Sequence, residues 1–387
     1  MTAEKKAKTP LFHIAKRDKI PFWKSALIRV IAVALALVIC SLFAYIFAGV
    51  GPDKLFSALF DGNFSSDRRV WTLAKDTSIL LGIALALTPA FLMRFWNIGG
   101  EGQVLVGALG ATACAVNFGG KIGEVPLLLM MLCAALFLGA LWGFIPAFFK
   151  AMWNSNETLF TLMMNYLAIQ LVRYMIAIWA PTDNTLGELS FGHFNLFPSD
   201  SWSFGDELTV ILIALLITIF LYIYLRFGKQ GYEISVVGES ENTARYIGIN
   251  VKKVTVRTMV LSGLLCGLVG FLIVSVFDHS ITSETVGGQG FTAIMVSWLA
   301  KFNPIVMVGT AFLITFLNRG ADQLVSDLSN TQVENFLTRG AGADGPTGIS
   351  PDFPSIIVSV ILLFIVGCEF FIHYEIKFHK TRKEAQK

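Results

Sequence analysis

Residues 254–277 read VTVRTMVLSGLLCGLVGFLIVSVF, and this stretch decides the fold class. Apart from Arg257 near its start, it carries no charged residue. At 1.5 Å per residue, a helix of this length covers the hydrocarbon layer of a membrane, which is about 30 Å thick. Small residues recur four apart at Ser262, Cys266 and Gly270, a pattern that lets helices approach closely in lipid. The stretch is therefore predicted to cross a membrane and to pack against other helices.

Further apolar segments of the same kind fill most of the chain. Of its 387 residues 55% are hydrophobic and 15% are charged, whereas soluble chains carry about 25% charged residues. We therefore predict an all-α, polytopic transmembrane bundle of about ten spans, which forms one transmembrane domain over residues 27–374. The predicted spans are 27–49, 77–93, 102–118, 126–149, 158–180, 208–225, 254–277, 291–300, 304–317 and 354–374.

The basic residues are distributed unevenly among the connectors. With ten spans, both termini lie on one side, and that side holds most of the 30 lysines and arginines, including those of segments 1–26 and 375–387. Because basic connectors stay inside, both termini are predicted to be cytoplasmic. The first span is too long for a signal peptide and is predicted to remain as an anchor. Loops 181–207 and 319–353 are then extracellular; they are predicted to form an outer vestibule, or in the second case a disordered connector.

Motifs of catalysis and metal binding are missing from the sequence. It has no phosphate-binding loop of the form G-x-x-x-x-G-K-[ST], no H-E-x-x-H and no G-x-S-x-G. Its histidines are scattered, and no basic stripe indicates a nucleic-acid partner. We therefore expect no enzyme activity and no cofactor or metal bound by this chain. The five cysteines lie in apolar segments without any C-x-x-C pair and are interpreted as core residues: Cys40, Cys114, Cys133, Cys266 and Cys368.

A polar, glycine-rich stretch, NIGGEGQ, lies between the second and third predicted spans, at residues 97–103. Its glycines weaken a helix, while Asn97, Glu101 and Gln103 bring polar groups close to the membrane. Irregular backbone at membrane depth occurs only where protein or a water-filled path surrounds it. The stretch is therefore either a helix break that faces a translocation path or an ordinary cytoplasmic turn with a solvated Glu101.

The fifth predicted span begins with NETLFTLMMNY, residues 156–166. Asn156 or Ser155 is a suitable N-cap, and Asn165 lies about two turns deeper in the helix. A buried amide needs hydrogen-bond partners, so Asn165 either binds a neighbouring helix or faces a pore. Arg173 is close enough to the end of the span for its charge to reach the membrane surface.

The cytoplasmic connector 227–253 contains a short predicted helix. Ser240 is a suitable N-cap and Gly248 a suitable C-terminal residue, which places the helix between them. The helix has a mixed polar and apolar surface that suits docking to a soluble partner. The alternative is a solvated linker helix.

Four segments of the chain together resemble a known family of permeases. Residues 97–110 (NIGGEGQVLVGALG), 156–168 (NETLFTLMMNYLA), 244–251 (ARYIGINV) and 290–304 (GFTAIMVSWLAKFNP) resemble those of ABC importers of the branched-chain amino-acid and ribose type. The likeness is greatest to the subgroup that takes up nucleosides and simple sugars.

This resemblance implies a fold and a set of partners. The fold is that of a type II-like importer permease in a bacterial-type plasma membrane. Such permeases pair with a second permease, identical or homologous, and with two cytoplasmic ATPase subunits that bind ATP and Mg. An extracellular or periplasmic binding protein, often a lipoprotein, delivers the substrate. By resemblance, coupling to the ATPase falls on Glu239, Ala244, Arg245, Tyr246, Gly248 and Ile249.

The expected function is import of nucleosides by alternating access. Simple sugars such as ribose or galactose, and branched-chain amino acids, are alternative substrates within the family. An ion-coupled secondary transporter is a rival, although such proteins usually place carboxylates inside their spans, and these spans are nearly free of them. The residues expected to line the substrate path are Asn97, Glu101, Gln103, Asn165 and Trp298.

Overall fold

The computed structural model describes residues 12–16, 22–48, 51–181, 186–197 and 204–339, single positions between 356 and 367, and the strand 374–378. Most of the predicted last span and of the C-terminal tail, and part of both predicted outer loops, lie outside the described residues. The described chain divides into two compact units, residues 63–316 and the pair of segments that precede and follow them.

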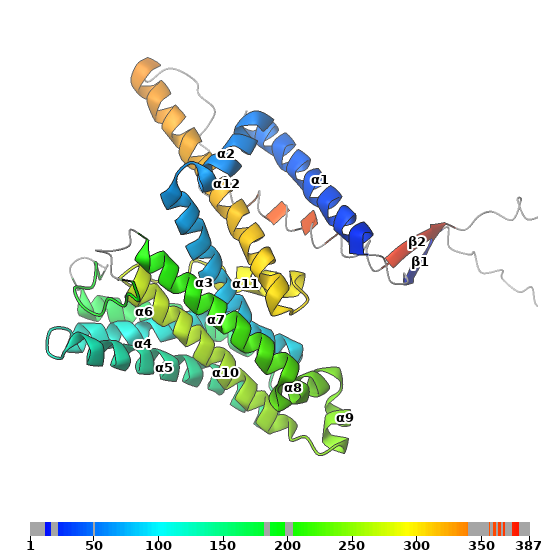
Figure 1. Ribbon diagram of the computed structural model, residues 1–387, viewed down its shortest axis with the longest axis vertical. Helices are drawn as coiled ribbons and strands as arrows, with labels where there is room; N and C mark the ends of the chain where they lie inside the picture. The colour runs from blue at the N-terminus through cyan, green and yellow to red at the C-terminus, as the bar shows by residue number, and fades with distance from the viewer. Residues whose placement is uncertain are drawn as a thin grey trace, which may run out of the picture. The chain divides into compact units, whose positions relative to one another are not determined.

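The larger unit is helical and contains every residue expected to function. Figure 1 shows α4, α5 and α10 side by side, with α8 and α9 at one end of the unit. Ser66 caps α3, and Asn156, one of the two predicted candidates, caps α6, because each side-chain oxygen accepts a backbone N–H of the first turn. The helices are α3 (Asp67–Leu92), α4 (Gly100–Phe118), α5 (Glu124–Trp153), α6 (Glu157–Trp179), α7 (Gly205–Phe227), α8 (Lys229–Glu239), α9 (Glu241–Tyr246), α10 (Val251–Leu272) with its π-helical continuation η1 (Ile273–Phe277), α11 (Gln289–Leu299) and α12 (Pro304–Arg339), which continues into the smaller unit.

The smaller unit contains α1 (Phe22–Ala48), most of α2 (Pro52–Phe64) and a two-stranded sheet. Strand β1 (Phe12–Lys16) pairs antiparallel with β2 (Tyr374–Phe378), so that Phe12 lies opposite Phe378. Glycine lets α2 and the later part of α12 approach closely, since a Cβ atom on Gly320 would lie 2.7 Å from Leu59 Cα. The first predicted span, 27–49, lies within α1 except for its last residue, and α1 begins five residues earlier, at Phe22.

Six described helices are long and apolar enough to cross a membrane: Asp67–Leu92, Glu124–Trp153, Glu157–Trp179, Gly205–Phe227, Val251–Phe277 and Pro304–Leu324. They contain, in order, the predicted second, fourth, fifth, sixth, seventh and ninth spans. Only residue 93 of the predicted second span and residue 180 of the predicted fifth span lie outside these helices. The predicted eighth span is α11, whose 11 residues cover only about 16 Å and cannot cross the bilayer alone. The multi-pass helical architecture is confirmed, while the count of ten and the side of the termini stay predictions.

Small residues allow α10 to pack directly against α4 and α5. A Cβ atom on Gly267 would collide with the Ala135 carbonyl oxygen, and one on Gly107 would lie 2.5 Å from Gly267 Cα. The predicted small-residue face of α10 is buried throughout, at Ser262, Cys266 and Gly270. The packing role predicted for this pattern is therefore confirmed.

Two predicted connectors prove to be helical. The connector 227–253 contains α8 as well as the predicted short helix; Ile234 and Val237 give α8 a buried face, and its glycines obscured this in the sequence. Residues 319–339, predicted as the start of an outer loop, continue α12, because neither glycine nor proline occurs between residues 321 and 339. The expectation of a loop from residue 319 was therefore wrong, whereas the side of the membrane on which this stretch lies stays a prediction.

Candidate functional site

The glycine-rich stretch between α3 and α4 is a buried helix break. Asn97 is wholly buried, and its Nδ2 donates to Ser262 Oγ at 3.2 Å, while its Oδ1 accepts from the Gly99 amide at 3.0 Å. Ser262 lies about 16 Å along α10 from its first residue, near the middle of that span. The irregular backbone thus lies at membrane depth and is enclosed by protein, as irregular backbone there requires.

Glu101 joins the break to α11. Its Oε1 accepts from the Gly288 amide at 2.9 Å and its Oε2 from the Gly290 amide at 2.8 Å. These amides lie at the N-terminus of α11, where unpaired N–H groups and the helix dipole favour a negative charge. Glu101 is only 5% exposed, so the alternative of a cytoplasmic turn with a solvated Glu101 was wrong.

Asn165 joins the break to α6. Its Oδ1 accepts from the Gly102 amide at 2.9 Å, and its Nδ2 donates to the Ile98 carbonyl oxygen at 2.9 Å. The same helix contributes Thr161, whose hydroxyl accepts from the Ile98 amide at 3.2 Å. Of the two roles weighed for Asn165, the structure shows helix packing.

Gln103 is the most weakly hydrogen-bonded residue of this polar cluster. Its Nε2 donates to Asn97 Oδ1 at 3.3 Å, and its Oε1 is buried without a hydrogen bond from any described residue. Four of the residues expected to line a path, namely Asn97, Glu101, Gln103 and Asn165, thus form one buried cluster that joins α4, α6, α10 and α11. They line no accessible surface in this structure.

Trp298, the fifth expected path residue, lies apart from this cluster. It is 48% exposed and stacks on Trp96 with ring centroids 5.3 Å apart. Phe91 and Phe302 pack edge-on against it at 6.4 and 5.5 Å. The structure therefore places Trp298 in an exposed aromatic cluster at the start of the break and the end of α11.

An exposed stripe along α6 was missed by the sequence analysis. Met163, Tyr166, Gln170 and Arg173 are all exposed and lie on one helical face, three or four residues apart. Gln170 lies close to the midpoint of the span, and its amide makes no hydrogen bond among the described residues. A polar side chain at the centre of a membrane span was the available signal, since such residues usually face protein or water.

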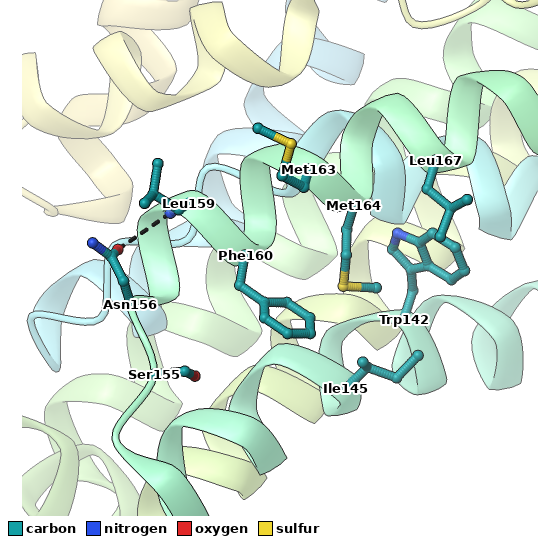
Figure 2. A pocket seen from close by; sticks show the side chains of 9 residues that line it. All are labelled: Trp142, Ile145, Ser155, Asn156, Leu159, Phe160, Met163, Met164 and Leu167. Carbon is teal, nitrogen blue, oxygen red and sulfur yellow. Dashed lines mark hydrogen bonds between the residues drawn. The ribbon is translucent and has the colours of Figure 1, made fainter.

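An open groove runs beside this stripe, between α5 and α6, and Figure 2 shows its side chains. Its volume is about 500 Å³, and its walls are mainly apolar. Trp142 contributes a buried Nε1–H that has no acceptor among the described residues. The groove is lined by Trp142, Ile145, Ser155, Asn156, Leu159, Phe160, Met163, Met164 and Leu167.

The predicted short helix of the connector exists as α9. Ser240 caps it by accepting from the Thr243 amide at 3.3 Å, as predicted, and Gly248 follows it with a φ of +85°. Tyr246 is 92% exposed, although an aromatic ring usually buries much of its surface. Arg245 is also exposed and pairs with Glu241 at 3.1 Å.

The remaining expected coupling residues divide between the surface and the interior. Glu239 and Gly248 are exposed, Ile249 is half-buried and Ala244 is wholly buried. Ala244 belongs to an apolar cluster with residues of α3, α5, α8 and α10, among them Met93, Ala147 and Ile234. The segment α8–α9 is therefore fixed to the end of α3, directly before the helix break.

No group of three or more histidine, cysteine, aspartate or glutamate side chains that could hold a metal gathers among the described residues. Cys266 is buried, whereas Cys133 is exposed, and both are free thiols. Cys368 lies outside the described residues. The chemistry of the described site is thus that of helix packing, hydrogen bonding and exposed aromatic surface.

Several known proteins are similar to this chain in sequence over most of its length. The chain is 28% identical to the guanosine ABC transporter permease protein NupP of Bacillus subtilis over 346 residues, which cover 88% of this chain and 93% of the relative. It is 24% identical to the nucleoside ABC transporter permease protein NupB of Lactococcus lactis subsp. cremoris, over 88% of this chain and 91% of the relative. It is also 24% identical to the glucose ABC transporter permease protein TsgB13 of Haloferax volcanii, over 93% and 92%.

A solved structure of an inward-facing ABC transporter of the metal-chelate type covers 90% of this chain at 17% identity, with a TM-score of 0.44. A family model described as "Branched-chain amino acid transport system / permease component" matches residues 70–366. That range contains all four segments on which the resemblance was based, and it includes both the helix break and α9. The chain belongs to this family of permease components: it is a multi-pass membrane subunit of an ABC transport system, in which separate subunits hydrolyse ATP.

Proposed function

We propose that this chain forms the translocation path of an ABC importer for nucleosides and works by alternating access. Two relatives that match most of the chain are named as guanosine and nucleoside permeases, which supports this substrate class. The glucose permease relative keeps simple sugars as the second candidate. Branched-chain amino acids, which the family description names, are the third.

The observation that carries the proposal is the exposed stripe of α6. An amide group that meets lipid costs several kcal/mol, so Gln170 requires water or protein beside it. Tyr166 and Tyr174 add aromatic rings to the same exposed face. Aromatic and amide groups are the side chains that stack on and hydrogen-bond to a nucleobase. We assign this stripe to the wall of the path, either alone or opposite a second permease.

In this proposal the buried cluster supports the path wall from behind. Asn165 lies on the face of α6 opposite the stripe and fixes the helix to the break. Asn97, Glu101 and Gln103 then act by holding α4 and α11 in place, while Trp298 contributes an exposed aromatic surface near one end of the path.

The proposed site of coupling to the ATPase subunits is α9. Its exposed Tyr246 and Arg245 suit a groove on a soluble partner, in which aromatic and arginine side chains commonly provide much of the binding energy. The apolar cluster around Ala244 would transmit movement of α9 to the end of α3. This assignment requires α9 and both termini to be cytoplasmic, with the substrate-delivering protein on the opposite side. Two ATPase subunits and a second permease complete the proposed assembly.

Uptake into proteoliposomes tests the proposal. The permease would be reconstituted with its ATPase subunits, second permease and binding protein, and offered radiolabelled guanosine, cytidine, glucose or leucine in separate assays. We expect ATP-dependent accumulation of the nucleosides alone, and none with a non-hydrolysable ATP analogue. Accumulation of glucose or leucine in place of nucleosides would reassign the substrate, and accumulation without hydrolysis would exclude the ABC mechanism.

A reciprocal pair of variants tests the path wall. Gln170→Leu should reduce nucleoside uptake about tenfold while the protein stays folded in the membrane. Leu216, at the middle of α7, is 65% exposed and serves as the matched position. If that face meets lipid, Leu216→Gln should lower the folded yield rather than the uptake per folded molecule. Equal behaviour of the two variants would contradict the assignment of α6 to the path.

A further inference from the structure

A second groove, separate from the α6 stripe, lies where α5 ends and α10 begins. Its volume is about 580 Å³, within the range of roughly 300–1,000 Å³ typical of small-molecule sites. One wall consists of apolar side chains from the last turns of α5, including Phe144, Phe148 and Met152. The other wall comes from the first turns of α10 and includes Lys252, Lys253 and Arg257.

The basic wall has an excess of positive charge. Arg257 pairs with Glu233 at 3.0 Å, whereas Lys252 and Lys253 are exposed and form no ion pair within the described residues. The positive end of the α10 dipole adds to this charge, although Asn250 already accepts the Lys253 amide at 3.1 Å. The groove therefore complements a negatively charged ligand.

The apolar wall belongs to a helix that is largely exposed. Only 7 of the 30 residues of α5 are buried, and its exposed side chains are mostly apolar, as expected of a span that meets lipid. Trp153 ends the helix and is 64% exposed, in the position that aromatic residues take at the membrane surface. A ligand in this groove would thus hold its charge at the level of the lipid headgroups and its apolar part along α5.

We propose that this groove binds an anionic phospholipid, with the headgroup phosphate against Lys252 and Lys253 and an acyl chain along Phe144 and Phe148. Basic pockets between membrane helices are known to take such headgroups. The assignment to the inner leaflet rests on the orientation in the proposed function. Because Asn250 follows directly after the coupling segment, the lipid would lie beside α9 and steady the start of α10.

Native mass spectrometry of the purified full-length permease tests the site. The protein in detergent would be titrated with dioleoylphosphatidylglycerol and, separately, with dioleoylphosphatidylcholine, and the Kd of the first bound lipid measured. We expect tighter binding of the phosphatidylglycerol. The double substitution Lys252→Gln/Lys253→Gln should weaken it about 25-fold, at about fivefold for each lysine.

Two further variants keep the test independent of net charge and of misfolding. Arg226→Gln/Lys229→Gln removes two exposed charges at the junction of α7 and α8, outside the groove, and should leave the Kd unchanged. Ala151→Trp fills the groove without changing charge and should weaken binding as well. Retained melting temperatures would show that each variant is folded.

Three results would overturn the proposal: equal binding of the two lipids, equal loss in the groove and control variants, or loss of the bound lipid when the ATPase subunits assemble. The last would show that the groove belongs to a protein interface. Nucleoside uptake by the wild-type protein in phosphatidylcholine vesicles separates this proposal from the proposed function. Equal Kd values for the two lipids together with nucleoside uptake refute the lipid site alone, whereas selective binding of phosphatidylglycerol without nucleoside uptake refutes the proposed substrate alone.

Discussion

Residues 97–103 and 231–249 are both short, polar, glycine-containing stretches between spans, yet the structure uses them in opposite ways. In the first, Asn97, Glu101 and Gln103 are buried, and their hydrogen bonds join helices far apart in the sequence. In the second, Tyr246 and Arg245 extend into solvent, and only one apolar face is held. Stretches of similar composition therefore form a buried contact between helices in one case and an exposed surface in the other.

The largest effect on the free energy of unfolding is expected from Glu101→Ala. The substitution leaves the half-buried Gly288 amide and the buried Gly290 amide without an acceptor, at a cost of about 1–3 kcal/mol each and thus about 2–6 kcal/mol together. Thermal unfolding of the protein in detergent measures it. Glu284→Ala is the control, because this carboxylate is exposed and pairs with Arg173 at 3.8 Å, which contributes less than about 1 kcal/mol. Similar losses in both variants would mean that Glu101 is solvated and that the two stretches do not differ.

Asn165→Leu should destabilise the protein by about 2–4 kcal/mol. It leaves the Gly102 amide and the Ile98 carbonyl group without their partner, although neither bond involves a charged group. Gln103→Leu, measured in the same unfolding assay, should cost only about 1 kcal/mol because Gln103 makes a single, longer hydrogen bond of 3.3 Å. A greater loss at Gln103 would indicate that it, rather than Asn165, holds the break.

Gly238→Ala tests how firmly the second stretch is fixed. A Cβ atom at this position would collide with the Leu92 carbonyl oxygen, and such overpacking costs about 1–3 kcal/mol. Gly248→Ala is the matched control in the same stretch; it meets no atom within 4 Å, but its φ of +85° should cost about 1 kcal/mol. If Gly238→Ala has no effect on the melting temperature, α8 is not anchored to α3.

His279 follows η1, lies outside the predicted spans and should make the stability of the fold depend on pH. Burial and the neighbouring His193 lower its pKa below the usual 6.5, while Asp206 and Glu188 act in the opposite direction. The unfolded chain therefore takes up this proton more readily, so the stability of the fold should decrease as the pH falls below 6.5. His279→Gln should reduce this dependence in unfolding experiments at a series of pH values. An unchanged pH profile would show that other groups cause it.

Tyr246→Ala should have the smallest effect on stability, within about 0.5 kcal/mol, because its side chain touches little of the protein. ATP-dependent nucleoside uptake should nevertheless fall about tenfold or more if this residue anchors the ATPase. Tyr246→Phe should restore most of the uptake when packing, rather than the hydroxyl group, provides the contact. Unchanged uptake in the alanine variant would show that Tyr246 does not anchor the ATPase subunit.

The parts of the site that follow local rules were predictable from the sequence. Side-chain capping placed the start of α6 at Ser155 or Asn156 and that of α9 at Ser240, because each cap involves residues only two or three positions apart. The partners of Glu101 were not predictable, since Gly288 and Gly290 lie almost two hundred residues further along the chain. The helix α8 was missed because Gly231 and Gly238, which lower helix propensity, are there to allow close packing.

The sequence by itself determined that this protein is helical, crosses a membrane several times and belongs to a permease family, because apolar length and local motifs are properties of consecutive residues. Only the tertiary structure decided that the polar residues around Glu101 are buried, that α11 is too short to cross alone, and that Gln170 is exposed near the middle of a span. Those facts depend on which helices pack together. That packing depends on small residues, such as Gly267 and Gly107, that approach each other from distant parts of the chain.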